Sequence, residues 1–242
     1  MSPELVPTLV LHRRRYGETG LLLELFTLTQ GRVPVIARGA ASPRSRRRGL
    51  LQPFVPLRVA WRGRGEVGTL TTVEADGVPM QLSGRVLYAG LYLNELLTRL
   101  LPRGDAAPQL FHHYRQALDD LASGGDLEGA LRRFEMRLLE DLGYAPDLGR
   151  QVDGTPVVAE GRYRCEPGSG VTIAGDSGPE TLSGETLLAL AEGRLPASET
   201  LRREARQLMR RLLAPHLGER PLKSRELFRT MRAVSRTPGN SR

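Results

Sequence analysis

The chain has 242 residues, 40% hydrophobic and 26% charged, which excludes a wholly disordered chain and suits one large domain or two modest ones. The formal net charge of +8 predicts a polyanionic partner, which could be nucleic acid, an acidic protein segment or a membrane surface. The single cysteine, Cys165, excludes an intrachain disulfide and a zinc site made of cysteines alone.

The first 80 residues are predicted to form an all-β domain. Five strand-length runs rich in apolar and β-branched residues are separated by turn signals, and they cover residues 9–14, 21–27, 33–37, 54–61 and 67–75. Five strands in about 70 residues are typical of a small closed barrel, and the OB-fold is the common five-stranded form.

An arginine-rich segment separates the third and fourth of these runs. We call residues 38–48 the arginine loop; its basic side chains are Arg38, Arg44, Arg46, Arg47 and Arg48. A basic loop inside a small β-domain is held at a fixed place on a folded surface, where it can offer charge to a phosphate backbone. An ordinary solvated loop is the alternative interpretation.

The same domain carries further arginines at strand ends and turns, namely Arg13, Arg14, Arg15 and Arg32. Basic charge clustered on one small barrel is the electrostatic footprint of a nucleic-acid-binding protein. Few aromatic residues accompany it, and the barrel core could claim most of them. We therefore expect binding dominated by charge, strongly dependent on salt and nearly blind to base sequence.

From residue 81 the apolar pattern becomes helical, which predicts a second domain over residues 81–235. Its first three helices are expected over residues 82–101, 109–121 and 127–142. Asp126 is a suitable N-cap for the third helix, and Gly143 follows its end as a glycine C-cap would.

The rest of the chain alternates between short elements. A small β insertion is expected around residues 150–180, with strands at 157–158, 163–165 and 171–173. Helices follow over 183–191, 198–213 and 222–231, with Ser183 and Ser198 as N-caps. Residues 236–242 are predicted to be a disordered tail. The fold class is thus α+β: a five-stranded OB barrel followed by a mainly helical domain.

Two helices carry arginines whose simplest role is structural. Arg132 lies four residues after Glu128, and Arg133 lies four residues before Arg137. Ion pairing on the helix face is the preferred interpretation for Arg133 and Arg137, whereas for Arg132 an anion-binding role beside an apolar groove stays open. Arg202, Arg206 and Arg210 follow each other at intervals of four residues. This spacing indicates a solvated basic face, and nucleic acid or an acidic peptide is its less common meaning.

No constellation of residues indicates catalysis, so we expect a binding protein without a cofactor rather than an enzyme. The adjacent acids Asp119 and Asp120 project in different directions from a helix, and no phosphate loop or nucleophile elbow is present. No run approaches the ~20 apolar residues of a membrane span, and no signal peptide is visible. We therefore expect a cytoplasmic, nucleoid-associated protein with no membrane contact.

Several motifs, in order and over nearly the whole length, resemble the RecO family of bacterial DNA repair proteins. In the β-domain they are Gly31-Arg-Val33, Ala37-Arg-Gly-Ala40, Leu51-Gln-Pro-Phe54 and Gly63-Arg-Gly-Glu66. In the helical domain they are Leu91-Tyr-Leu-Asn-Glu-Leu-Leu97, Leu131-Arg-Arg-Phe-Glu135, Leu142-Gly-Tyr144 and Leu222-Lys-Ser-Arg-Glu-Leu-Phe-Arg229.

This resemblance implies a recombination mediator with an N-terminal OB-fold and a helical domain. Such proteins bind single-stranded DNA and the acidic C-terminal tail of the single-stranded DNA-binding protein, and they anneal complementary strands. With RecR they help to load RecA onto coated gaps, and RecF is a further candidate partner. Two other hypotheses stay open at this stage: an RNA-binding OB-fold protein of translation or ribosome assembly, and a nuclease.

The sequence departs from the family at one point. Many members carry a four-cysteine zinc motif after the Leu-Gly-Tyr segment, whereas only Cys165 stands in this stretch, with Gly168 where its partner belongs. One ligand cannot hold structural zinc, so no metal is expected. A site for the acidic tail needs an apolar groove and cations, for which the candidates are Leu131, Arg132, Tyr144 and Lys223.

Overall fold

The computed structural model describes residues 4–63, 65–175, 178, 180–224 and 226. They form two compact units: the first holds the residues up to Gly124 together with those from Arg220 onward, and the second is Gly125–Glu219. The predicted division after residue 80 follows the change from strands to helices, whereas the units divide after Gly124. The predicted tail, residues 236–242, and residues 227–231 of the last predicted helix lie outside the described residues.

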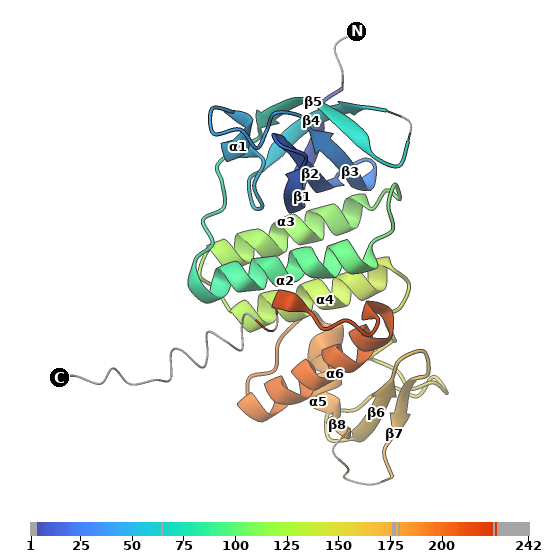
Figure 1. Ribbon diagram of the computed structural model, residues 1–242. Coiled ribbons are helices and arrows are strands. Elements are labelled where there is room, and N and C mark those ends of the chain that lie inside the picture. Colours follow the sequence, from blue (N-terminus) through green and yellow to red (C-terminus); the bar gives the residue numbers. More distant parts are fainter. Residues whose placement is uncertain (1–3, 64, 176–177, 179, 225, 227–242) are drawn as a thin grey trace, which may run out of the picture. The chain divides into compact units, whose positions relative to one another are not determined.

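In the first unit, five strands close into a barrel in the order β1-β2-β3-β5-β4 (Figure 1). The strands are β1 (Val6–Tyr16), β2 (Gly20–Thr27), β3 (Gly31–Ala37), β4 (Leu57–Arg62) and β5 (Gly68–Ala75). Neighbours are antiparallel except β3 and β5, which are parallel. Leucine and valine side chains from all five strands fill the interior. The predicted OB barrel is confirmed.

Two helices, α2 (Gly84–Leu100) and α3 (Pro108–Ala122), belong to the same unit as the barrel. Phe26 of β2 packs edge-on against Phe111 of α3, with ring centroids 5.3 Å apart. Asn94, buried on α2, donates to the Leu11 carbonyl of β1 at 2.9 Å and accepts from the Tyr114 hydroxyl of α3. Apolar packing and a buried polar chain therefore both join these helices to the barrel.

The arginine loop contains a helical turn that the sequence did not indicate. It leads into a one-turn helix, α1 (Arg47–Leu50), between β3 and β4. Ala40 within the loop and Leu51 directly after α1 are fully buried and join the barrel core. These two apolar residues therefore attach the segment to the barrel core on both sides of its arginines.

The second unit contains helices α4 (Leu127–Asp141), α5 (Gly184–Ala191) and α6 (Glu199–Leu217). It also has a three-stranded sheet in the order β7-β6-β8, formed by β6 (Arg162–Glu166), β7 (Gly170–Ile173) and β8 (Leu182–Ser183). The predicted N-caps are confirmed: side chains of Asp126, Ser183 and Ser198 accept from the backbone three residues later.

One predicted strand in this unit was wrong. Val157 and Val158 form no strand, because the Val158 carbonyl accepts from the Gly161 amide at 3.0 Å and closes a turn. The third strand of the sheet is instead β8, which pairs with β6 through Tyr163 and Leu182.

Candidate nucleic-acid interface

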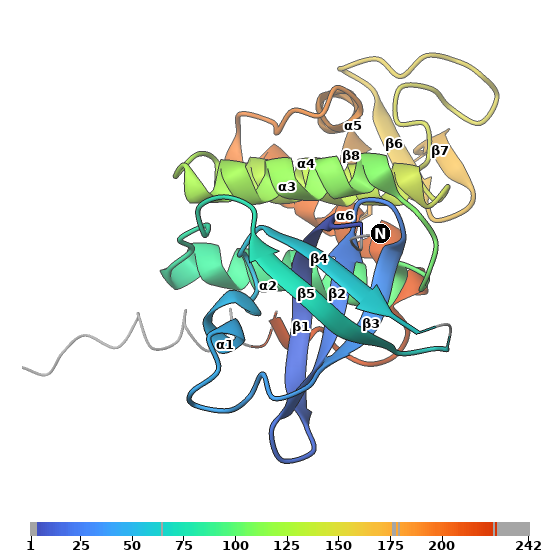
Figure 2. The ribbon, with the colours of Figure 1, turned by 90° about the horizontal axis from the view of Figure 1, so that it is seen from above.

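The barrel register brings the arginines of β1 to the start of the arginine loop. Arg15 near the end of β1 pairs with Leu21 at the start of β2, and Leu21 pairs with Ala37 at the end of β3. The arginine loop begins directly after Ala37. Arg13, Arg14 and Arg15 therefore lie at the same end of the barrel as the loop. Figure 2 shows this end, with the turn between β1 and β2 on the same side as the segment that leads to α1.

Between β1 and the loop lies a surface hollow of about 200 Å³, which we call the arginine hollow. Its lining is Arg13, Arg14, Arg15, Leu21, Ala41 and Arg48. None of these described lining residues is acidic, so the guanidinium charges are not offset within the hollow. Four guanidinium groups around one hollow can bind phosphate oxygens through several charge-assisted hydrogen bonds.

Two of the predicted DNA-binding arginines also hold the loop in place. The Arg13 guanidinium donates to the carbonyl oxygens of Leu51 at 3.2 Å and Arg48 at 3.5 Å. Arg47 donates to the Thr71 carbonyl of β5 at 3.2 Å. These bonds fix the loop against the barrel, so its other arginines project from a positioned surface. The sequence did not reveal this anchoring role, because all three acceptors are distant backbone carbonyls.

The remaining arginines of the group are exposed on this surface. They are Arg14 and Arg15 on β1 and Arg38, Arg44, Arg46 and Arg48 on the loop. Exposed guanidinium groups keep most donors free for a ligand, and a polyanion can meet several of them at once. Of the nine arginines predicted to bind DNA, the structure thus places four around the hollow and four more on the adjoining arginine loop.

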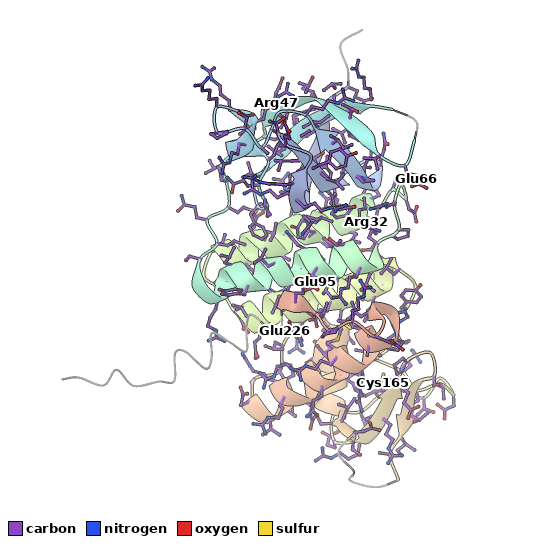
Figure 3. All side chains as sticks on the ribbon, in the orientation of Figure 1. Arg32, Arg47, Glu66, Glu95, Cys165 and Glu226 are labelled. Carbon is purple, nitrogen blue, oxygen red and sulfur yellow. The ribbon has the colours of Figure 1, made fainter. Side chains whose placement is uncertain are left out.

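The ninth, Arg32, lies apart from this group. It stands at the start of β3 and pairs with Phe26 of β2, at the opposite end of the strand from the loop. Its guanidinium lies 3.5 Å from the carboxylate of Glu24, which also binds Arg103. Burial lowers the pKa of Arg32 despite the opposing charge of Glu24. Figure 3 shows Arg32 on the α3 side of the barrel and Arg47 away from it.

The residues predicted to hold an acidic tail are distributed over both units. Leu131, Arg132 and Tyr144 belong to the second unit and Lys223 to the first. Leu131 is buried, and the exposed Tyr144 ring stacks on His216 with centroids 3.8 Å apart. Lys223 is exposed. The structure therefore offers an aromatic surface at Tyr144 rather than a groove at Leu131.

Arg132 is largely committed to an ion pair. Its side chain is 11% exposed and binds the carboxylate of Glu135 at 2.6 Å, and the Glu135 side chain is 1% exposed. The pair expected from the sequence was with Glu128, which instead binds Arg202 and Arg206 of α6. Long-range packing of α4 against α6 decides between these partners.

The basic stripe on α6 is partly neutralised, so its interpretation as a solvated face was wrong for two of its members. Arg202 lies 3.3 Å from the carboxylate of Asp126, and Arg206 lies 2.8 Å from that of Glu199. Hydrogen bonding to Glu199 is the largest cause that raises the pKa of Arg206. These acids reduce the charge that α6 offers to a polyanion.

Within the described residues, no group of three or more histidine, cysteine, aspartate or glutamate side chains could hold a metal ion. Cys165 is buried on β6, where burial raises the pKa of its thiol to about 11. No described helix combines the length and apolar character needed to span a bilayer.

Comparison with known proteins gives a family for the chain. Residues 1–77 match the family model described as Recombination protein O N terminal, and residues 81–226 match Recombination protein O C terminal. The chain is 50% identical over 222 residues to the DNA repair protein RecO of Methylococcus capsulatus, covering 91% of each chain.

Two further relatives give the same result. The DNA repair protein RecO of Halorhodospira halophila is 47% identical over 233 residues, which is 93% of this chain and 97% of the relative. That of Pseudomonas aeruginosa is 46% identical over 221 residues, which is 91% of this chain and 93% of the relative. On both family models and these identities, the chain belongs to the RecO family of DNA repair proteins.

Proposed function

We propose that this protein is a recombination mediator that binds single-stranded DNA through the arginine hollow and the exposed arginines of the adjoining loop. The observation that carries the proposal is the hollow itself: four guanidinium groups, no acidic lining residue among those described, and a loop anchored to the barrel. Such a surface suits a phosphate backbone because it meets several phosphates without first having to become ordered.

Annealing of complementary strands follows from the same charge. Two single strands repel each other through their phosphates, and guanidinium groups offset this repulsion when both strands lie on the protein. Base pairing then drives formation of the duplex, and no group on the protein has to react. We propose that the protein is not an enzyme.

The further partners proposed are the acidic tail of the single-stranded DNA-binding protein, RecR and, in the same process, RecA and RecF. Tyr144 is exposed and stacks on His216, which provides an aromatic surface for an apolar tail residue. Lys223 is an exposed cation in the other unit.

The proposal is tested by the rate at which two complementary oligonucleotides anneal in the presence of the protein. The hollow variant Arg14→Ala/Arg15→Ala/Arg48→Ala keeps Arg13, whose hydrogen bonds anchor the loop. The control variant Arg85→Ala/Arg137→Ala/Arg203→Ala removes the same charge from exposed positions elsewhere. We expect slower annealing with the hollow variant only. Equal loss in both variants would show that net charge, rather than the hollow, is responsible.

A further inference from the structure

One exposed aromatic residue stands beside the arginine hollow. Tyr16, the last residue of β1, is 51% exposed, and it directly follows the three arginines that line the hollow. The other aromatic residues of the barrel are less available: Phe26 and Phe54 are buried, and Trp61 is half-buried against the core. Tyr16 is thus the barrel aromatic that is open to a ligand.

The hairpin fixes where the Tyr16 ring lies. Tyr16 pairs with Gly20 across the turn between β1 and β2. A β-carbon on Gly20 would lie 2.5 Å from the carbonyl oxygen of Tyr16 and 3.7 Å from its ring atom Cδ1. The ring therefore rests beside backbone that carries no side chain. This support limits its freedom and leaves about half of its surface open.

The strand geometry also relates the ring to the hollow. The rung next to Tyr16 and Gly20 is the pair Arg15 and Leu21, and both of these residues line the hollow. Residues two apart on a strand share a face, so Tyr16 lies on the same face as Arg14, which is another lining residue. The Tyr16 ring therefore lies two rungs from Arg14 on the same face of the strand, and next along the chain to Arg15.

We propose that Tyr16 stacks on an unpaired nucleobase while the neighbouring arginines bind the phosphates of the same strand. The inference rests on the proposed function and adds to it a preference for single strands over duplexes. Every base has a π-face, so stacking adds affinity without adding sequence preference. In a duplex both faces of a base are already stacked, so Tyr16 gains little there, and phosphates alone bind the arginines.

The test compares two variants on two probes. Tyr16→Leu keeps an apolar side chain but removes the aromatic face, and Tyr16→Phe keeps the face without the hydroxyl. The probes are an oligothymidylate and an abasic oligomer of equal length, which presents the same phosphates without bases. For Tyr16→Leu we expect about 5- to 150-fold weaker binding of oligothymidylate, from the stacking contribution of one base. Its affinity for the abasic oligomer should equal that of the unaltered protein.

Further results of the same test decide between the stacking role, the proposed function and a folding effect. Tyr16→Phe should bind oligothymidylate within about twofold of the unaltered protein, because its ring still stacks. Unchanged binding by Tyr16→Leu would overturn the proposal, and so would equal loss on both probes, since that would place the effect in folding or charge. If the hollow variant weakens DNA binding and Tyr16→Leu does not, only the stacking role fails. If the hollow variant also binds normally, the proposed function itself fails.

Discussion

Replacing Asn94 tests how the barrel and the first two helices are held together. Asn94 is 3% exposed and Tyr114 is fully buried. The amide of Asn94 donates to the Leu11 carbonyl, and its carbonyl accepts from the Tyr114 hydroxyl. Burial raises the pKa of Tyr114 far above its ordinary value, so the hydroxyl stays protonated and remains a donor. Asn94 therefore links the Leu11 carbonyl and the Tyr114 hydroxyl in one buried chain of hydrogen bonds.

The expected loss of stability follows from how many buried polar groups lose a hydrogen bond in each variant. Each such group costs about 1–3 kcal/mol. Asn94→Leu removes the hydrogen bonds that the Leu11 carbonyl and the Tyr114 hydroxyl make with Asn94, so it should lower the free energy of unfolding by about 2–6 kcal/mol. Tyr114→Phe removes only the hydrogen bond to the Asn94 carbonyl and should lower the free energy of unfolding by about 1–3 kcal/mol. In the double variant only the Leu11 carbonyl loses its hydrogen bond to Asn94, because the Tyr114 hydroxyl is absent. The double variant should therefore be more stable than Asn94→Leu alone.

Tyr114→Phe should thus change sign, from destabilising in the natural background to stabilising in the Asn94→Leu background. The free energies come from urea titrations followed by the fluorescence of Trp61, which is the only tryptophan and lies in the barrel. It therefore reports on the unit that contains the chain of hydrogen bonds. Equal destabilisation by Tyr114→Phe in both backgrounds would refute this reasoning, because independent sites give additive effects.

Three shorter predictions concern other sites. Partial burial acts to raise the pKa of Glu95, but hydrogen bonds from Ser224 and Lys223 outweigh it and lower this pKa. Glu95→Gln should therefore lower the free energy of unfolding by about 1–2 kcal/mol in urea titrations at pH 7. The loss should become smaller as the pH falls through the lowered pKa. Gly31→Ala should lower the free energy of unfolding by at least about 2 kcal/mol, because its β-carbon would lie 1.7 Å from the Asp105 carbonyl oxygen. Gly17 has a similar positive φ but open space around it, so Gly17→Ala should cost less. Tyr144→Ala removes the exposed ring that stacks on His216, and should weaken binding of an acidic-tail peptide about tenfold in a fluorescence titration. Binding of naked DNA should be unchanged, and equal loss of both would contradict a separate tail site.

The elements of this fold could be predicted where the signal was local. The caps Asp126, Ser183 and Ser198 act on backbone three residues away, and all three predictions are confirmed. The five barrel strands also appear near their expected positions. Val157 and Val158 were misassigned, because a short apolar pair carries no information about the turn that its backbone closes.

The ion pairs could not be predicted, because they join residues that only the tertiary fold brings together. Glu128 was matched with Arg132 from their spacing, but it binds Arg206, 78 residues away. Arg32 was grouped with the DNA-binding arginines by charge, but the barrel places it beside Glu24. Sequence spacing predicts which residues share a helix face, and the contacts across elements decide which pairs form.

The candidate site was located correctly only in outline. The sequence placed a basic loop between the third and fourth strands, and the structure has α1 and the anchored loop there. The hollow itself depends on the register between β1 and β2, which sets Arg15 opposite Leu21. A shift of one residue would turn each side chain to the other face, and the sequence does not specify the register closely enough to predict a hollow.

The central claim is that the arginine hollow binds the phosphates of single-stranded DNA. Its most direct test is the salt dependence of oligothymidylate affinity for the natural protein, the hollow variant Arg14→Ala/Arg15→Ala/Arg48→Ala and the charge-matched control Arg85→Ala/Arg137→Ala/Arg203→Ala. Each lost phosphate contact reduces the slope of log affinity against log salt by about 0.7. The hollow variant should therefore have a slope smaller by about 2, and the control an unchanged slope. Equal slopes for the natural protein and the hollow variant would contradict the claim.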